Sequence, residues 1–113
     1  MDCLFCKILN DDIPSTKVFE NENVLGFVDI NPMAKKHFLF IHKEHTTDIN
    51  DLTLTQPNHL VEVFNAIHSF SSDSGLSKTG FRVVTNQGRE GGQTVFHTHF
   101  HVLGGEQLRG FGS

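Results

Sequence analysis

The sequence predicts an α+β domain in which one antiparallel sheet of about five strands carries one main helix. Short apolar runs of strand length recur along the chain, and turn-forming residues bound them. One longer segment differs, because its apolar residues recur at intervals of three and four between Leu60 and Phe70. That spacing is typical of an amphipathic helix, whose apolar stripe would pack on the sheet.

Composition sets the class of protein. The chain has 113 residues, and we expect a single domain over residues 1–113 with a real core. Its formal charge of −4 argues against a general nucleic-acid-binding or anionic-membrane surface. No apolar run approaches the roughly 18 residues of a membrane span, and the N-terminus lacks the pattern of a signal peptide, so we expect a cytoplasmic protein. The two cysteines, spaced C-x-x-C, then indicate metal or redox chemistry in a reducing compartment.

The N-terminal half contains most of the predicted strands. Residues 3–9 are long enough for one or two helical turns. Residues 17–20 and 24–29 read as two strands of a hairpin that turns at residues 21–23. The apolar run at residues 37–42 is a third strand.

The C-terminal half begins with a polar segment at residues 46–55, which we expect to be a loop with one helical turn near residues 49–52. Thr55 is the expected cap of the main helix, with Pro57 in its first turn, and the helix should end before Gly75. A fourth strand at residues 81–85 and a glycine-rich loop at residues 86–92 follow.

Three histidines in the last predicted strand are the main functional signal. His97, His99 and His101 alternate with apolar or β-branched residues, and the strand should end at Gly104 and Gly105. Successive side chains of a strand point to opposite faces. The three imidazoles should therefore share one face, and the other face should be anchored by Phe96, Thr98, Phe100 and Val102.

Three interpretations of this row are open. The histidines could be a polar, solvent-facing side of a strand, they could bind zinc, or one neutral imidazole could act as a nucleophile. Clustered imidazoles resist protonation, because each charge disfavours the next. The preceding loop, residues 86–94, offers backbone N–H groups, an amide and a hydroxyl as donors to phosphate oxygens, and it favours phosphorus chemistry.

Taken together, these segments resemble the histidine triad (HIT) superfamily over nearly the whole chain. The histidines His97, His99 and His101 match the triad itself. The other matching residues, in order, are Cys3–Ile8, Ile13–Pro14, Phe27–Pro32, His37, Lys43–His45, Phe81–Val84 and Gly91–His97. The ending Val102-Leu103-Gly104-Gly105 is similar to the Hint branch, the histidine triad nucleotide-binding proteins. The resemblance implies the HIT fold, with its short N-terminal helix.

The resemblance also implies an activity: hydrolysis of purine (AMP-type) nucleoside 5′-monophosphoramidates through a covalent nucleotidyl-histidine. His99 would be the nucleophile, His101 would hydrogen-bond the phosphate, the carbonyl of His97 would orient His99, and His37 would join a proton relay. The expected nucleotide-binding residues, besides His99 and His101, are Phe5, Ile8, Ile13, Phe27, Asp29, Ile30, Asn86, Gly92, Gln93 and Thr94. Asp29 could equally cap the turn before Asn31.

For metals and partners, the resemblance implies structural zinc on Cys3, Cys6, His45 and His97, a homodimer joined through main helices and sheet edges, and no organic cofactor. His42 is an alternative to His45 as the metal ligand. His59 and His68 are expected on the solvated surface. Two other functions stay open: a nucleotide- or zinc-binding adaptor with incidental turnover, and a dinucleoside polyphosphate hydrolase, which the Leu-Gly-Gly ending disfavours.

Overall fold

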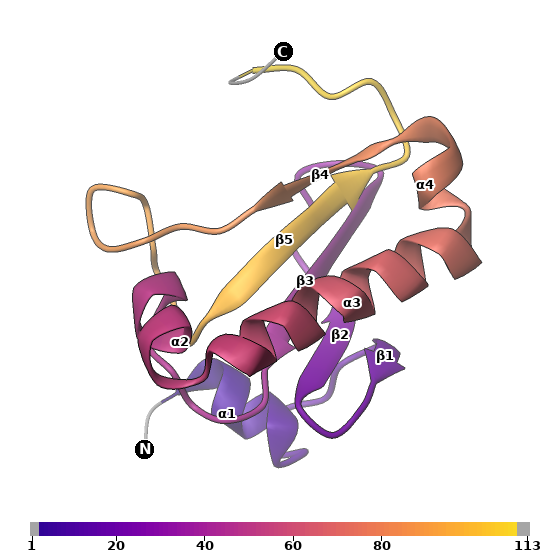
Figure 1. Cartoon of the computed structure of the whole chain (residues 1–113). Coiled ribbons are helices and arrows are strands. Elements are labelled where there is room, and N and C mark those ends of the chain that lie inside the picture. The colour runs from indigo at the N-terminus through magenta and orange to yellow at the C-terminus, as the bar shows by residue number, and fades with distance from the viewer. Residues whose placement is uncertain (1–2, 111–113) are drawn as a thin grey trace.

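A computed structural model describes residues 3–110, and it confirms the α+β class. Within that range five strands form one antiparallel sheet in the order β1-β2-β3-β5-β4, so the last strand lies between β3 and β4 (Figure 1). The strands are β1 (Lys17–Glu20), β2 (Val24–Val28), β3 (Lys36–His42), β4 (Phe81–Val84) and β5 (His99–Gly104).

Register between β3 and β5 decides which side chains share a face of the sheet. Leu39 lies opposite His101, and Phe40 lies opposite Phe100. Directly opposed residues of an antiparallel pair point to the same face. One face therefore carries histidines beside aliphatic residues, whereas the other face is aromatic.

The aromatic face packs against the main helix, α3 (Pro57–Ser74), which crosses the sheet in Figure 1. The predicted stripe contributes Val63, Ile67 and Phe70 to this core, and burial of each such side chain contributes about 1.5–3 kcal/mol. Gly75, with φ of 84°, ends the helix in the left-handed conformation that glycine adopts without strain.

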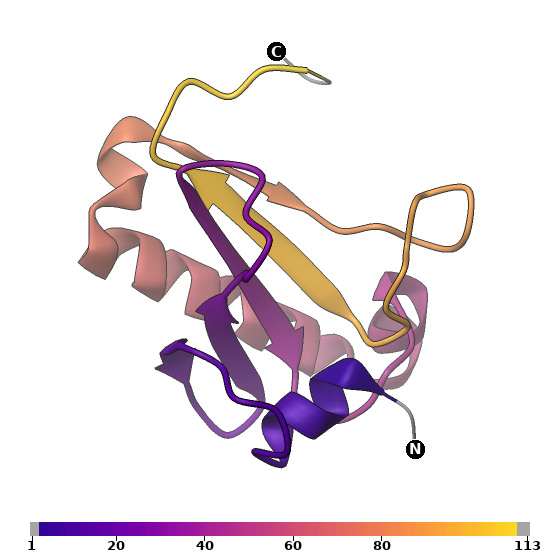
Figure 2. The same cartoon turned by 180° about the vertical axis from the view of Figure 1, so that it is seen from behind.

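A short helix, α1 (Leu4–Leu9), covers the histidine-bearing face at its β2 and β3 side (Figure 2). Its Phe5 and Ile8 are buried in a second core with Leu25, Leu39 and other residues of β2 and β3. The sheet is therefore covered on both faces, by a long helix on one and by a two-turn helix on the other.

One helix is longer than predicted, and another was not predicted. The helical turn expected near residues 49–52 is the start of α2 (Ile49–Thr55), and the Asp48 carboxylate caps this helix by accepting the N–H of Asp51. The N-cap of α3 is consequently Gln56 and not Thr55. A four-residue helix, α4 (Leu76–Thr79), follows Gly75 and buries Leu76.

The histidine strand is shorter than predicted. Pairing with β3 begins at His99, and His97 and Thr98 lie in the preceding bend. The Thr98 N–H donates to the carbonyl of Thr46, outside β3, and only the Thr98 carbonyl still bonds to β3, by accepting the N–H of His42. The expectation that Phe96 anchors the back of the strand is wrong, since 52% of its surface is exposed.

In the part of the chain from residue 3 to residue 110, none of the helices has both the length and the apolar character needed to cross a membrane.

Candidate active site

A cavity of about 450 Å³ lies on the histidine-bearing face, between α1, the end of β2 and the loop that precedes β5. The residues expected to bind the nucleotide or act in catalysis that line it are Phe5, Ile8, Ile13, Phe27, Asp29, Ile30, His37, Asn86, Gly92, Thr94, His99 and His101. Two expected residues, His97 and Gln93, do not line it. The fold thus gathers segments that are up to 96 positions apart, Phe5 to His101, around one space.

His99 is held in one tautomer. Its Nδ1 lies 2.7 Å from the carbonyl oxygen of His97. A carbonyl oxygen can only accept, so Nδ1 carries the hydrogen. In the neutral ring Nε2 then has a free lone pair, and none of the hydrogen bonds found among residues 3–110 involves that nitrogen.

The tautomers of His37 and His101 are also set by their hydrogen bonds, which run in series from the backbone of Met33. The backbone N–H of Met33 donates to His37 Nδ1 at 2.9 Å, so a neutral His37 carries its hydrogen on Nε2. His37 Nε2 lies 2.8 Å from His101 Nδ1 and donates to it. His101 therefore carries its hydrogen on Nε2, where it can donate to a ligand.

The Asp29 carboxylate contacts His37, a member of this series of hydrogen bonds. Its Oδ2 lies 3.3 Å from His37 Nε2, and its Oδ1 accepts the N–H of Asn31 at 2.8 Å. The turn-capping interpretation of Asp29 is thus correct, and it coexists with a position on the cavity wall.

Burial keeps the three cavity histidines neutral. It lowers the pKa of His101 from its ordinary 6.5 to about 4, with further lowering from charge on His99 and His37. Burial also lowers the pKa of His99, although the His97 carbonyl partly opposes this. The pKa of His37 is lowered by burial against the opposing charge of Asp29. Neutral imidazoles keep the lone pairs that a nucleophile needs.

The loop before β5 forms one wall of the cavity. Gly92 has φ of 82°, and its open backbone lies beside the Asn86 amide, which donates to the Gly91 carbonyl at 2.7 Å. Gln93, which is expected to bind the ligand, forms hydrogen bonds that hold this loop in place. Its amide donates to the carbonyls of residues 47 and 95, and its oxygen accepts the N–H of residue 88.

Apolar side chains form the opposite wall. Phe5 is 4% exposed, and its ring meets the rings of Phe27 and His99 edge to face, with centroids 5.8 and 5.0 Å apart. Ile30 lies at the rim and is 86% exposed. The cavity therefore has an apolar slot at one end and the histidines at the other.

His97 faces a different group of residues, the cluster of Cys3, Cys6 and His45. Its Nδ1 lies 3.3 Å from Cys3 Sγ and 3.6 Å from Cys6 Sγ, and Cys6 Sγ lies 3.2 Å from His45 Nδ1. The other ring nitrogen, Nε2, donates to the backbone carbonyl of His42. This bond directs the Nδ1 lone pair of His97 toward the thiols.

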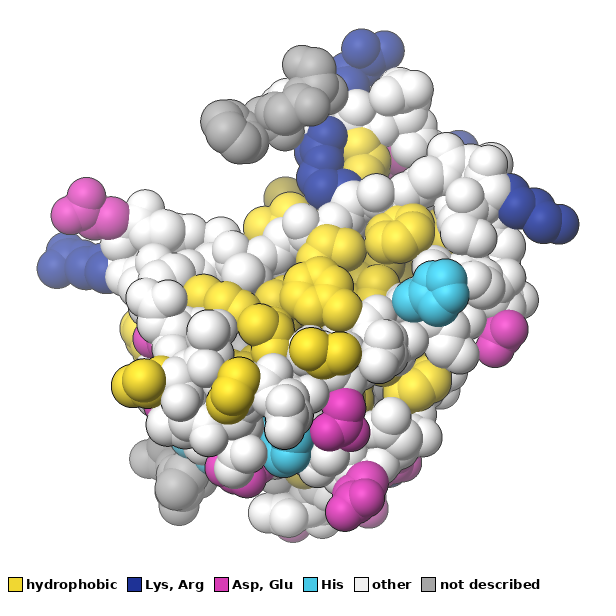
Figure 3. All heavy atoms as spheres, in the orientation of Figure 1, with side chains coloured by type: hydrophobic (Ala, Val, Ile, Leu, Met, Phe, Trp, Pro, Cys, Tyr) yellow, Lys and Arg dark blue, Asp and Glu magenta, His cyan; other side chains and the backbone are white. Residues whose placement is uncertain are grey.

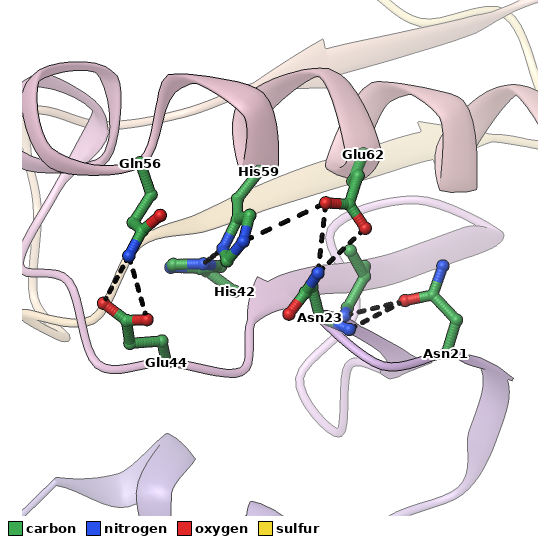
Figure 4. Close-up of polar contacts among 8 residues, drawn as sticks. Asn21, Asn23, His42, Glu44, Gln56, His59 and Glu62 are labelled. Atoms are coloured by element: carbon green, nitrogen blue, oxygen red, sulfur yellow. Dashed lines mark hydrogen bonds and ion pairs between the residues drawn. The ribbon is translucent and has the colours of Figure 1, made fainter.

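His42 itself points the other way, toward α3. Its ring lies beside that of His59 (Figure 4), with its Nε2 2.8 Å from His59 Nδ1. Its Nδ1 lies 3.0 Å from the Thr46 hydroxyl. Both ring nitrogens of His42 are thus turned away from the thiols, and the potential metal ligands that lie together are Cys3, Cys6, His45 and His97, without His42. His59, expected on the solvated surface, is half-buried in this contact, with Glu62 4.0 Å away, whereas the expectation of an exposed His68 is confirmed.

Sequence reasoning missed Met33, whose backbone sets the His37 tautomer, and the pair formed by His42 and His59. Alternation with Phe38 and Phe40 could have placed His42 on the helix-facing side of β3, but it could not have identified His59 as the partner.

The comparisons with known proteins agree with this geometry. The family model described as HIT domain matches residues 10–108. A histidine triad protein from Clostridium difficile is 41% identical and superimposes with a TM-score of 0.93, covering 98% of this chain and 96% of that one. A HIT family hydrolase from Legionella pneumophila Philadelphia 1 is 42% identical, with a TM-score of 0.90 and 96% of each chain covered.

A histidine triad nucleotide-binding protein from Candida albicans is more distant. It is 31% identical, with a TM-score of 0.82, and the match covers 89% of this chain and 73% of that one. The family model and the solved structures lead to the same conclusion: this chain belongs to the HIT domain family.

Proposed function

We propose that this protein hydrolyses purine nucleoside 5′-monophosphoramidates, with His99 as the nucleophile. One observation carries the proposal: the bond from His99 Nδ1 to the His97 carbonyl leaves the Nε2 lone pair free in a ring that lines the cavity. A neutral, oriented imidazole next to donors for phosphate oxygens is suited to attack on phosphorus. The hydrolase and nucleotide-binding descriptions of the two relatives from Legionella and Candida support this choice.

The reaction would proceed in two displacements. In the first, the lone pair of His99 Nε2 forms a bond to phosphorus, and the P–N bond breaks with its electron pair going to nitrogen. That nitrogen takes a proton from solvent and leaves as the amine. In the second, water attacks phosphorus, the bond from phosphorus to Nε2 breaks, and the water proton returns to solvent. The product is a nucleoside monophosphate.

The cavity offers a place for each part of the substrate. The His101 Nε2–H would donate to a phosphoryl oxygen, with the open backbone of Gly92 and the Thr94 side chain beside it. The slot at Phe5 and Phe27 would take the flat base, and Asp29 Oδ2 would accept from ribose hydroxyls.

Structural zinc is part of the proposal. Bond lengths of 2.3 Å to sulfur and about 2.05 Å to nitrogen give a sulfur–nitrogen separation of about 3.6 Å in a tetrahedral site. The observed separations between the thiols and the imidazole nitrogens are 3.2 to 3.6 Å, so the cluster of Cys3, Cys6, His45 and His97 fits the ion. Zinc would tie α1 to the bend before β5, and it takes no part in the chemistry.

A homodimer is also proposed, with a second copy of the chain on the outer face of α3. Val61 and Phe64 are exposed on that helix, and Phe81 is exposed on β4, an edge strand. Figure 3, which looks at this side, shows hydrophobic side chains gathered on the surface. Such a patch favours association with another surface. Sedimentation should give a dimer, and Val61→Lys should give a monomer, whereas Ser69→Lys on the same helix should not. A monomeric parent would refute the assembly.

The activity test uses adenosine 5′-phosphoramidate and follows the release of AMP. The parent should turn over, and His99→Ala should lose activity by at least about 10³-fold, since the covalent route is removed. His68→Ala, at an exposed histidine, is the matched control and should match the parent. Absence of turnover by the parent, or faster hydrolysis of diadenosine polyphosphates, would contradict the proposal.

A further inference from the structure

The peptide group between His97 and Thr98 is held at both of its polar ends. Its carbonyl oxygen, from His97, lies 2.7 Å from His99 Nδ1, and its N–H, from Thr98, donates to the Thr46 carbonyl at 2.8 Å. The peptide bond is trans, so the C=O and the N–H point in opposite directions within one plane. The anchor at Thr46 therefore sets the direction from which the His97 carbonyl meets His99.

The Thr98 hydroxyl fixes the same bend a second time. Its Oγ1 lies 2.9 Å from the carbonyl oxygen of Asp48 and 3.2 Å from that of Thr46. Carbonyl oxygens can only accept, so the hydroxyl hydrogen of Thr98 points to them. The Thr46 hydroxyl, 2.7 Å from Thr98 Oγ1, is then the donor in the bond between the two side chains. Both threonines are buried, so their hydroxyls depend on these partners.

His42 continues this series of hydrogen bonds toward α3. The Thr46 hydroxyl gives its one hydrogen to Thr98, so it accepts from His42 Nδ1, which lies 3.0 Å away. The neutral His42 ring then has its lone pair on Nε2, and this atom accepts from His59 Nδ1 at 2.8 Å. Each bond in the series from His59 to the bend thus has one direction, and the series supports the anchor from the side of the sheet opposite the cavity.

We propose that Thr46 and Thr98 are positioning residues for His99, and its role as the nucleophile rests on the proposed function. Neither threonine is among the described residues that line the cavity. They act through the His97 carbonyl, which keeps the hydrogen of His99 on Nδ1. If this peptide group turned, His99 Nδ1 would lose its acceptor, and the ring could carry its hydrogen on Nε2, the atom that must attack phosphorus.

Substitutions at Thr98 test this role. In Thr98→Val a methyl group takes the place of Oγ1, only 2.7 to 3.2 Å from three oxygen atoms. Carbon and oxygen stay about 3.3 Å or more apart, so the bend has to move. Thr98→Ala removes the hydroxyl without this clash, and Thr98→Ser keeps the oxygen and should rescue. Ser71→Ala is the matched control, because this equally buried hydroxyl donates to the His68 carbonyl on α3.

Nitrogen-15 spectra of the full chain without substrate report the tautomer of His99. The parent, Thr98→Ser and Ser71→Ala should carry the hydrogen on Nδ1, whereas Thr98→Val and Thr98→Ala should show a mixture of the two tautomers. In steady-state kinetics on adenosine 5′-phosphoramidate, Thr98→Val should lower kcat by at least about tenfold and change KM by less than about twofold, since substrate contacts are kept. Thr98→Ser should restore kcat to within about threefold of the parent value.

Circular dichroism reports whether a variant is folded, and Thr98→Ala replaces Thr98→Val if the latter does not fold. Folded variants without the Thr98 hydroxyl that keep His99 on Nδ1 alone would overturn the proposal. A Thr98→Ser variant that behaves like Thr98→Val, or a Ser71→Ala variant with the same mixture of tautomers, would overturn it too. If the parent has no turnover, the proposed function fails, but the tautomers still decide whether Thr98 positions His99.

Discussion

Replacing His37 tests how the cavity controls the tautomer of His101. His37→Phe keeps a flat ring in a position that is 4% exposed, but it removes both the donor to His101 Nδ1 and the acceptor for the Met33 N–H. Without that donor, His101 is free to carry its hydrogen on Nδ1, and it then presents a lone pair to the phosphate in place of a donor.

The magnitude follows from one neutral hydrogen bond whose acceptor is largely buried. Losing such a bond costs about 1–3 kcal/mol, which corresponds to about 5–150-fold in kcat/KM if the bond matters in the transition state. We expect most of the loss in kcat, because the phosphate charge that His101 meets grows during the displacement.

Steady-state kinetics on adenosine 5′-phosphoramidate measures the loss, and nitrogen-15 spectra of the imidazoles measure the tautomer. The parent should show His101 protonated on Nε2, and His37→Phe should show a mixture. His68→Phe is the control. A parent His101 protonated on Nδ1, or an unchanged kcat/KM in a folded His37→Phe variant, would refute the reasoning.

Three further predictions concern the structural zinc, the stability at low pH and the apolar slot proposed to bind the nucleotide base. Cys6→Ser should abolish zinc binding at the cluster of Cys3, Cys6, His45 and His97 and lower the melting temperature. If a zinc chelator left the melting temperature of the parent unchanged, this prediction would be contradicted. Burial lowers the pKa of His101 from 6.5 to about 4, so below about pH 6.5 the unfolded chain binds a proton that the folded chain excludes, and the free energy of unfolding should fall from pH 6.5 toward pH 4. Urea unfolding at pH 7 and pH 5 measures this, and higher stability at pH 5 would be the opposite result. Phe5→Ala should raise KM for the phosphoramidate by about tenfold, which corresponds to about 1.4 kcal/mol. Phe81→Ala, outside the cavity, should leave KM unchanged. Equal changes of KM in the two variants would contradict the proposal that the base binds beside Phe5.

The sequence predicted the elements whose hydrophobic pattern is periodic. The stripe from Leu60 to Phe70 gave α3, and the run at residues 37–42 gave β3, because burial on one face imposes a period on the side chains. It predicted only one turn of α2, near residues 49–52, and missed its continuation to Thr55, because the residues of this segment are mostly polar.

Within the site, alternation correctly placed His99 and His101 on one face, and His97 also faces α1, because the Phe5 ring contacts the rings of both His97 and His99. Alternation did not predict where the strand begins, since the N–H of Thr98 donates to the carbonyl of Thr46 and pairing with β3 starts at His99. The separation of His97 from the other two was implied by the resemblance, through Cys3 and the rest of its cluster, and not by the spacing.

Contacts between distant segments were beyond sequence reasoning. The His42 and His59 pair joins a strand to a helix 17 positions away, and the Met33 N–H reaches His37 through a turn of its own. Gln93 is a further example, because sequence reasoning did not predict that its amide holds the loop through hydrogen bonds with residues 47 and 88. These outcomes depend on backbone geometry that no local pattern encodes.

The most direct test of the central claim is to trap the covalent intermediate. Protein mixed with adenosine 5′-phosphoramidate and quenched within a turnover should carry one adenylyl group, and mass spectrometry of the peptides should place it on His99. His99→Ala should carry none, and His101→Ala, which keeps the nucleophile, should still carry the group on His99. An adenylyl group on another residue, or full turnover by the folded His99→Ala variant, would contradict the account.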